Sequence, residues 1–458
     1  MLGALLPRRQ ECPASAFLSM QAIRQMHDAA PHDSWNGPVP DASQQKRLPL
    51  ISLSHFWRTK QHPDPHGETL QLLGAALRRW MPEYEAHGYP DMDVFIDWCS
   101  CYQEPRSEVE QSASFELALM HINMWYAHAL TTVWVVSRPP VEPPQGFRPY
   151  HERGWTTFEY QLGSLATTAA CANVWAQIVD VSEVGEIVQP APASPWAFEE
   201  GGAFGGLTFT NGADRQRVAH KFRQTMVDVL SAQEELNYAL HAWGQAEVEQ
   251  LAISWPLCTQ LRRLDLSRTK LTALPDTIGS IASLEELRVN WCTRLVALPE
   301  SLSSLRSLRV LELRLCKVPK LPDSIGSLMA LVHLDLHSCV NLTALPASFG
   351  ALGSLETLDL HGTRIELADA AHSLLGLLAL RWLDLGQPKR TRLGGEEVDE
   401  SIRAALPGLR YFFPSCGGAA DHVVPLTPPQ APPCHLWRAQ LRATRALQAM
   451  LEAAGRRL

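Results

Sequence analysis

The chain has 458 residues, a formal net charge of −8 and a hydrophobic fraction of 46%, which is enough for two or three domains with buried cores. The acidic balance argues against nucleic acid as the partner of the whole protein, and no apolar run reaches the 18 residues that a membrane-spanning helix needs. The apolar stretch at the start of the sequence is too short for a secretory signal, and ten cysteines without framework spacing suit a reducing compartment. We therefore expect a cytoplasmic protein without a membrane span.

The first half of the chain alternates apolar runs with amphipathic stretches. Residues 1–45 show little periodicity, and we expect a weakly ordered leader there. The expected strands are 48–56, 92–98, 131–137 and 174–181, and the expected helices are 67–87, 110–130, 153–170 and 214–245. Apolar strands separated by helices of this length predict parallel pairing, and so an α/β domain over residues 46–245 whose last helix is long.

Polar residues follow the expected strands where a parallel α/β sheet binds its ligands, beyond the carboxyl ends of the strands. The residues that we expect to line such a crevice are His55, Asp97, Ser100, Arg106, Arg153, Trp155 and Glu159. The alternative is that these side chains only cap helices or face water. No metal is expected, because the Cys99 and Cys101 pair has no second pair to complete a zinc site.

The segment Trp155-Thr156-Thr157-Phe158-Glu159 opens the third expected helix. Its spacing resembles the Trp-Cys-x-x-Glu segment of Toll/interleukin-1 receptor (TIR) domains, with Thr156 in the place of the cysteine. The resemblance implies a flavodoxin-like or TIR-like sheet, and it implies that Glu159 acts in cleaving NAD or a nucleoside at the glycosidic bond. NAD would then be a substrate, and no resident cofactor is expected. Otherwise Glu159 is a charge placed favourably at a helix N-terminus.

Four longer phrases also carry a resemblance: SLSHFW, DVFIDWCSCYQEPR, YHERGWTTFE and LTFTNGADRQRVAHKF. Together they resemble an uncharacterised α/β domain of protist proteins over residues 48–232. This resemblance implies a fold and no particular activity.

The second half of the chain repeats the pattern Leu-x-x-Leu-x-Leu. The pattern starts at Leu261, Leu284, Leu308, Leu331, Leu355 and Leu380, in steps of 23, 24, 23, 24 and 25 residues, and a weaker start follows at Leu406. One such unit cannot bury its leucines alone, so the units must stack. A period of this size predicts a leucine-rich repeat solenoid of six or seven units over residues 246–416.

One turn position in each unit holds a small polar side chain. The residues at this position are Thr269, Cys292, Cys316, Cys339 and Thr363. We expect them to bond the backbone of the neighbouring turn, so that the cysteines have a structural role.

Phrases such as LPDTIGSIASLEEL and LPDSIGSLMALVHLDL resemble the repeats of plant intracellular immune receptors and of Ras-group repeat proteins. The resemblance implies protein recognition and signalling. It does not extend to the nucleotide-binding module of those receptors, because the chain has no G-x-x-x-x-G-K-[ST] motif.

Side chains between the strand leucines should line the concave face of the solenoid and bind a partner. They are Asp265, Arg288, Glu312, Arg314, His333, Asp335, His337, Asp359, His361, Trp382 and Asp384. This mainly acidic ladder predicts a protein partner with a basic strip, and the alternative is an idle solvated face.

Residues 417–433 are rich in Pro and Gly and predict a linker, and residues 434–458 predict a basic amphipathic helix. That helix would contact a membrane surface, a calmodulin-like protein or the acidic face of the repeats, or it would only cap the solenoid. Taken together, the sequence predicts a protein-interaction scaffold or a receptor-like signalling protein. The alternative is an NAD- or nucleoside-cleaving enzyme whose repeats act as a sensor.

Overall fold

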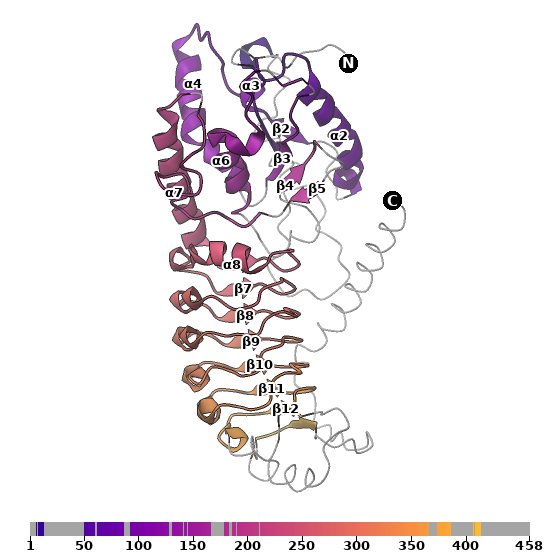
Figure 1. The fold of residues 1–458 in the computed structure, drawn as a ribbon, viewed down its shortest axis with the longest axis vertical. Coiled ribbons are helices and arrows are strands. Elements are labelled where there is room, and N and C mark those ends of the chain that lie inside the picture. The colour runs from indigo at the N-terminus through magenta and orange to yellow at the C-terminus, as the bar shows by residue number, and fades with distance from the viewer. Residues whose placement is uncertain are drawn as a thin grey trace.

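The computed structural model describes residues 6, 8–12, 50–59, 62–86, 92–127, 131–140, 142–143, 145–165, 178–182, 186–188, 190–209, 211–365, 373–385, 406 and 408–413. An α/β domain sits on the end of a solenoid built of stacked turns (Figure 1). The expected linker 417–433 and the expected helix 434–458 lie outside the described residues, as does most of the expected leader. Among the described residues, none of the helices combines the length and the apolar character needed to span a bilayer.

The sheet of the α/β domain has five strands in the order β2-β1-β3-β4-β5. Their bounds are β1 Leu50–His55, β2 Asp93–Phe95, β3 Thr132–Val136, β4 Ile178–Asp180 and β5 Glu186–Val188. The first four are parallel, as the apolar runs predicted, and every residue of β1 and β3 is buried. The antiparallel strand β5 was not expected.

Helices cover both faces of this sheet. Their bounds are α2 Glu68–Ala86, α3 Asp97–Ser100, α4 Val109–Met120, α5 Ile122–Ala127, α6 Gly154–Gly163 and α7 Asp214–Ala232. Helix α2 packs with Ile51 and Leu53 on one face, whereas α5, α6 and α7 share the other buried cluster with Val133. Two expectations need correction. The strand expected over 92–98 ends early because α3 begins at Asp97, and the helix expected over 110–130 is broken at His121.

Part of the expected leader packs against the domain. The 3-10 turn η1 (Arg9–Glu11) places the Gln10 side-chain amide 2.8 Å from the carbonyl oxygen of Gln103, to which it donates. Leu6 is buried, and its carbonyl accepts a hydrogen bond from the Trp98 indole at 3.1 Å.

The helix expected over 214–245 is wrong in its second half. Helix α7 ends at Ala232, and β6 (Glu235–Asn237) then joins the sheet of the solenoid, with Leu236 in register with Leu264. Burial of Leu236 in the leucine stack outweighs the helical pattern of the segment. The repeat sheet therefore begins at residue 235 rather than 246.

The junction between the two parts is closely packed. Helix α8 (Gln245–Ala252) and the 3-10 turn η4 (Trp255–Leu257) follow β6, and the Gln250 amide donates to the carbonyls of Ala191 and Pro192 at 3.0 and 3.1 Å. Buried residues form one continuous cluster from the α/β sheet into the repeats. The α/β domain thus covers the apolar end that a solenoid must protect.

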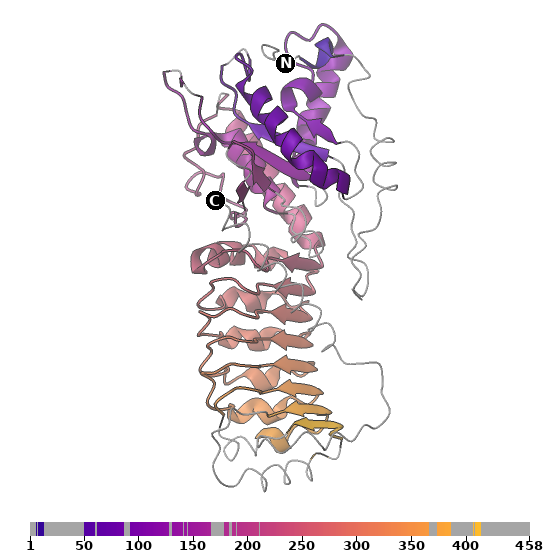
Figure 2. The same ribbon diagram turned by 90° about the vertical axis from the view of Figure 1, so that its right-hand side faces the viewer.

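The sheet of the solenoid has eight parallel strands stacked in chain order (Figure 2). After β6 they are β7 Arg263–Asp265, β8 Glu286–Arg288, β9 Val310–Glu312, β10 His333–Asp335, β11 Thr357–Asp359, β12 Trp382–Asp384 and β13 Tyr411–Phe413. The opposite side is built of the 3-10 turns η5 Asp276–Ser280, η6 Glu300–Ser304, η7 Ile325–Ser327 and η8 Ala347–Ala351. A proline opens each of these turns or shortly precedes it, as at Pro275 and Pro299.

A ladder of thiols joins consecutive repeats, as the sequence predicted. The thiols of Cys292, Cys316 and Cys339 donate to carbonyl oxygens of the preceding unit, with sulfur–oxygen distances of 3.3, 3.1 and 3.0 Å. Burial raises the pKa of Cys339 to about 12, so its thiol stays protonated and able to donate. The hydroxyls of Thr269 and Thr363 instead bond within their own turns.

Candidate functional site

The first candidate site is the exposed face of the solenoid sheet, which we call the strand face. The eleven residues predicted to line it all lie within β7–β12 or within two residues of a strand end, and alternate with buried leucines such as Leu311 and Leu334. This placement follows from strand geometry, because successive side chains point to opposite faces of a sheet.

Ion pairs within and between strands compensate part of the acidic charge on the strand face nearest to the α/β domain. Arg263 lies 3.6 Å from Glu235 and 3.4 Å from Glu286. Arg288 lies 2.9 Å from Glu286 and 3.5 Å from Glu312. This part of the face therefore presents paired charges rather than a field of one sign.

The other part of the strand face stacks like charges. Asp335 is in register with Asp359, and Asp359 is in register with Asp384. Asp335 is only 1% exposed and Asp359 only 5%. In each of these two, one carboxylate oxygen accepts the backbone N–H two residues later, at 2.8 Å from His337 and at 2.9 Å from His361.

Burial and mutual repulsion change the protonation of this acidic group. Burial raises the pKa of Asp335 to about 6 and that of Asp359 to about 8, and the neighbouring aspartates contribute to the shift at Asp359. Burial also lowers the pKa of His333 to about 4 and that of His337 to about 3, helped at His337 by Arg314. These histidines are therefore neutral near pH 7 and do not compensate the carboxylates.

The histidines approach each other without forming a metal site. The rings of His337 and His361 have centroids 4.8 Å apart. Within the described ranges, no group of three or more His, Cys, Asp or Glu side chains is arranged to hold a metal ion.

The second candidate site is a buried group of polar side chains at the end of β1. Ser54 donates to a carboxyl oxygen of Glu159 at 2.6 Å, and its hydroxyl lies 2.5 Å from that of Tyr150. The Tyr126 hydroxyl lies beside them and donates to the carbonyl of Leu53 at 3.3 Å. Burial raises the pKa of Glu159 well above its usual range, which favours the protonated form of this carboxyl.

A second carboxyl lies near this group. Asp97 lies 3.4 Å from the imidazole of His55 and accepts the indole N–H of Trp57 at 3.2 Å. Burial works to raise the pKa of Asp97, but its interactions with His55, Trp98 and Trp57 hold the pKa below its usual range. The structure therefore brings His55 to Asp97, and the charge of Asp97 in turn contributes to the raised pKa of Glu159.

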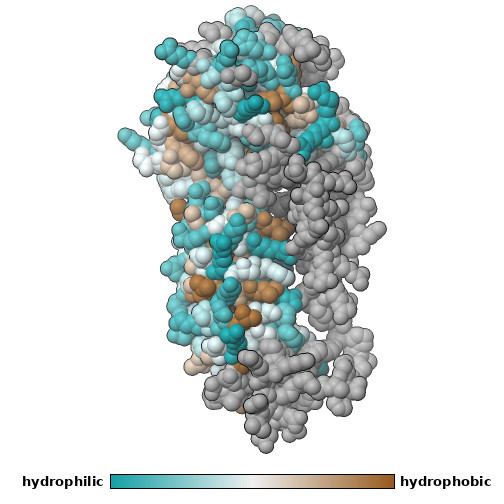
Figure 3. All heavy atoms as spheres, turned by 45° about the vertical axis from the view of Figure 1, so that its right-hand side comes forward, coloured by the Kyte–Doolittle hydropathy of each residue, from teal (hydrophilic) through white to brown (hydrophobic). Residues whose placement is uncertain are grey.

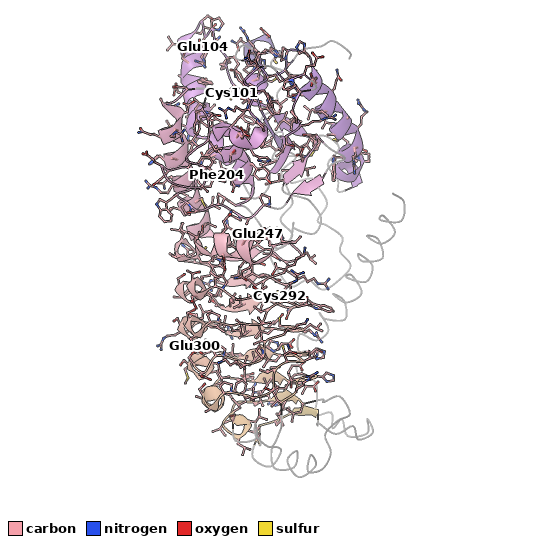
Figure 4. The ribbon with its side chains drawn as sticks, in the orientation of Figure 1. Cys101, Glu104, Phe204, Glu247, Cys292 and Glu300 are labelled. Carbon is pink, nitrogen blue, oxygen red and sulfur yellow. The ribbon has the colours of Figure 1, made fainter. Side chains whose placement is uncertain are left out.

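Two residues of the expected crevice point elsewhere, which corrects the prediction. The Trp155 indole donates to Asp214 on α7 at 3.1 Å, because α6 presents this side chain to its neighbouring helix. Arg106 lies 3.7 Å over the ring of Phe115 and pairs with Glu104, at the end of the α/β domain remote from the solenoid (Figure 4).

Two further residues are placed at the edge of the group. Arg153 donates to the carbonyl of Trp57 at 2.9 Å and stacks over Phe56. Ser100 accepts the backbone N–H of Ile96 at 3.1 Å, which leaves it a structural role in the turn into α3.

Sequence reasoning missed Ser54, Tyr126 and Tyr150. The signal for Ser54 was present, because Ser52 and Ser54 occupy alternate positions of an otherwise apolar strand. The two tyrosines reach Ser54 and Leu53 from distant segments, so no local pattern could identify them.

Comparison with known proteins agrees with the solenoid. A family model described as a leucine-rich repeat region matches residues 291–410. The solenoid is a leucine-rich repeat domain. The solved structure of a leucine-rich repeat protein from Leptospira interrogans is similar at 18% sequence identity and a TM-score of 0.25, over 44% of this chain and 69% of that chain.

Proposed function

We propose that the leucine-rich repeat domain binds a protein partner through the strand face of β10–β12. The partner would insert an Arg or Lys side chain against Asp335 and Asp359, and the protein would serve as an interaction scaffold or as a receptor-like signalling component. The observation that carries this proposal is the contrast along the face. In the repeats near the α/β domain, Arg263 and Arg288 pair with carboxylates, whereas Asp335 and Asp359 stack in register beside neutral histidines, with Arg314 as the neighbouring cation.

Electrostatics favours a cationic partner at this place. An incoming guanidinium would relieve the repulsion between the carboxylates and form charge-assisted hydrogen bonds, worth about 1.5–3 kcal/mol each. Asp359, with a pKa of about 8, would lose its proton when the cation binds. Binding is therefore coupled to proton release.

A selection from a random peptide library displayed on phage, with the full chain as bait, tests the proposal. We expect the selected peptides to be enriched in Arg and Lys. Because bound carboxylates are charged and free ones are partly protonated, we expect their affinity to increase as the pH rises from 6 to 8.5. Fluorescence anisotropy of the selected peptides measures this change.

A matched pair of variants provides the control. Asp335→Asn/Asp359→Asn keeps an oxygen for the turn hydrogen bonds, removes the charge, and should weaken binding at least tenfold at pH 8.5. Asp276→Asn/Asp323→Asn changes the net charge equally on the opposite side of the repeats and should have no effect. Peptides without cation enrichment, or equal binding by both variants, would contradict the proposal.

A second candidate function is cleavage of NAD or a nucleoside in the α/β domain. Two observations support it: Asp97 and Glu159 lie together at the carboxyl ends of parallel strands, and the order β2-β1-β3-β4 corresponds to that of a flavodoxin-like sheet. Antiparallel β5 departs from that pattern. The raised pKa of Glu159 suits this carboxyl to give a proton, while a charged Asp97 would stabilise an oxocarbenium ion.

Release of nicotinamide from NAD by the full chain tests this second function. We expect Glu159→Gln, which preserves the acceptor for Ser54, to lower the rate by about 10²–10⁴-fold. Glu152→Gln, with no role in the buried group, should retain the rate. Absence of nicotinamide release from the unmodified chain would reject cleavage of NAD and leave the proposal of partner binding unaffected.

A further inference from the structure

One edge of the solenoid carries charge of a single sign. It is built by the loops that follow the strands, residues 267–275, 290–299, 314–322, 337–346 and 361–365, and these loops contain no Asp or Glu. Their basic residues are Arg268, Lys270, Arg294, Arg314, Lys317, Lys320 and Arg364. Because the chain as a whole has a net charge of −8, its Asp and Glu residues are concentrated outside this basic edge.

The loops stack in register, so their side chains form a row. The backbone N–H of Arg268 donates to the carbonyl of Asn290 at 2.8 Å, and that of Trp291 donates to the carbonyl of Arg314 at 2.7 Å. The same bond continues from Leu315 to the next repeat at 2.8 Å. We call this row the rim, and its cations are Arg268, Lys270, Arg294, Lys317 and Arg364.

The rim cations are not neutralised by the protein as described. No ion pair joins them to a carboxylate of the described residues. The opposite edge differs, because Arg262 pairs with Glu285 at 2.9 Å and Arg381 with Glu356 at 3.5 Å. The rim therefore retains a field that attracts an anionic surface.

Apolar side chains are exposed between the rim cations. Trp291 is 41% exposed, Val296 49% and Val340 43%. The guanidinium of Arg268 lies 5.0 Å over the Trp291 ring, which fixes an aromatic face beside a positive charge. Hydrophobic and hydrophilic surface alternate over the repeats in Figure 3.

Backbone strain marks the same row. Leu240, Arg268, Trp291, Leu315 and Ser338 occupy equivalent turn positions with φ of 68°, 64°, 61°, 60° and 57°, where glycine is favoured. In this row of described turns, Gly362 alone satisfies that preference, with φ of 73°. A residue other than glycine in this conformation costs about 1 kcal/mol or more, and the hydrogen bonds between neighbouring turns hold the backbone in it.

We propose that the rim docks on an anionic membrane surface, with Trp291 and Val296 entering the interfacial region and the rim cations facing lipid headgroups. Aromatic and aliphatic side chains combined with basic ones are the composition that such surfaces bind. A nucleic acid would use the cations and Trp291 but would gain little from Val296 and Val340. This surface is distinct from the strand face, so the proposal does not depend on a protein partner.

Cosedimentation of the full chain with vesicles tests the proposal. We expect binding to phosphatidylcholine vesicles that contain 30 mol% phosphatidylserine, weak binding to pure phosphatidylcholine, and weaker binding as NaCl increases. The variant Arg294→Glu/Lys317→Glu should bind at least about 30-fold more weakly, since each Lys or Arg near such a surface contributes about 1 kcal/mol.

A control variant distinguishes an effect of the rim cations from an effect of the net charge of the protein. Arg306→Glu/Arg309→Glu lies on the loop that leads into β9, on the opposite edge. Both double variants replace two cations by two anions, so each changes the net charge from −8 to −12. The control should bind like the unmodified chain. Equal loss in both variants, or no loss in the rim variant, would overturn the proposal.

The variant Trp291→Gly tests whether vesicle binding can be weakened without a loss of folding stability. Glycine relieves the strained φ of 61°, so we expect unchanged or higher stability in urea together with several-fold weaker vesicle binding. Unchanged vesicle binding would contradict insertion of the indole. Rim-dependent binding of a single-stranded oligonucleotide without binding of vesicles would also overturn the proposal.

Discussion

Replacement of Leu334 by alanine is expected to destabilise the protein by about 2–5 kcal/mol. Leu334 has no exposed surface and is in register with Leu311 on one side and Leu358 on the other. Its loss leaves a cavity between two neighbouring units, and the thiol ladder from Cys316 and Cys339 restricts their collapse into it. A cavity that does not collapse falls at the upper end of this range.

Urea denaturation followed by circular dichroism measures this effect. Leu378→Ala provides the matched control, because Leu378 is 75% exposed and its truncation should change the free energy of unfolding by less than about 0.5 kcal/mol. Similar losses from the two truncations would mean that the leucine column does not form the shared core.

Replacement of Asp359 by asparagine is expected to stabilise the protein at alkaline pH. The carboxyl has a pKa of about 8 in the folded protein, above its ordinary value near 3.8. The folded state therefore binds an additional proton between about pH 4 and pH 8, and its stability falls as the pH rises through this window. Above pH 8 the full penalty is present, and at 1.36 kcal/mol per pKa unit it reaches about 6 kcal/mol.

Asparagine removes this penalty because it has no charge, and its side-chain oxygen preserves the acceptor for the backbone N–H of His361. We expect a stabilisation of several kcal/mol at pH 9 and little change at pH 4, measured by urea denaturation of both proteins at each pH. Asp323→Asn, at an exposed position, should show no such pH dependence. A constant difference between pH 4 and pH 9 would exclude the raised pKa.

The repeat domain was predictable because leucine period and strand alternation are local properties. Leu264, Leu311 and Leu358 are buried in register, as their spacing required, and the strand-face residues between them follow from the same alternation. The first unit was missed because Glu235–Asn237 is too short to show a period. Only its pairing with β7 reveals it as a strand.

The candidate site in the α/β domain was predictable only in part. The rule that ligands bind at carboxyl ends of strands correctly brought His55 near Asp97. It could not indicate which way a helical side chain faces, so Trp155 was assigned to the crevice although it bonds to α7. The raised pKa values of the buried carboxyls and the left-handed turns could not be predicted, because they depend on burial and on the stacking of repeats rather than on any single segment of the sequence.

The continuous junction gives the repeats a geometric role. Helix α7, strand β6 and helix α8 follow one another along the chain and share their buried residues with the leucines, so the α/β domain and the repeats pack against each other at this junction. A molecule bound at β10–β12 would therefore lie at a distance from the α/β sheet that the number of intervening repeats determines. Inserting or deleting one repeat would change the distance between this molecule and the α/β sheet by about 4.8 Å, which is the distance between paired strands.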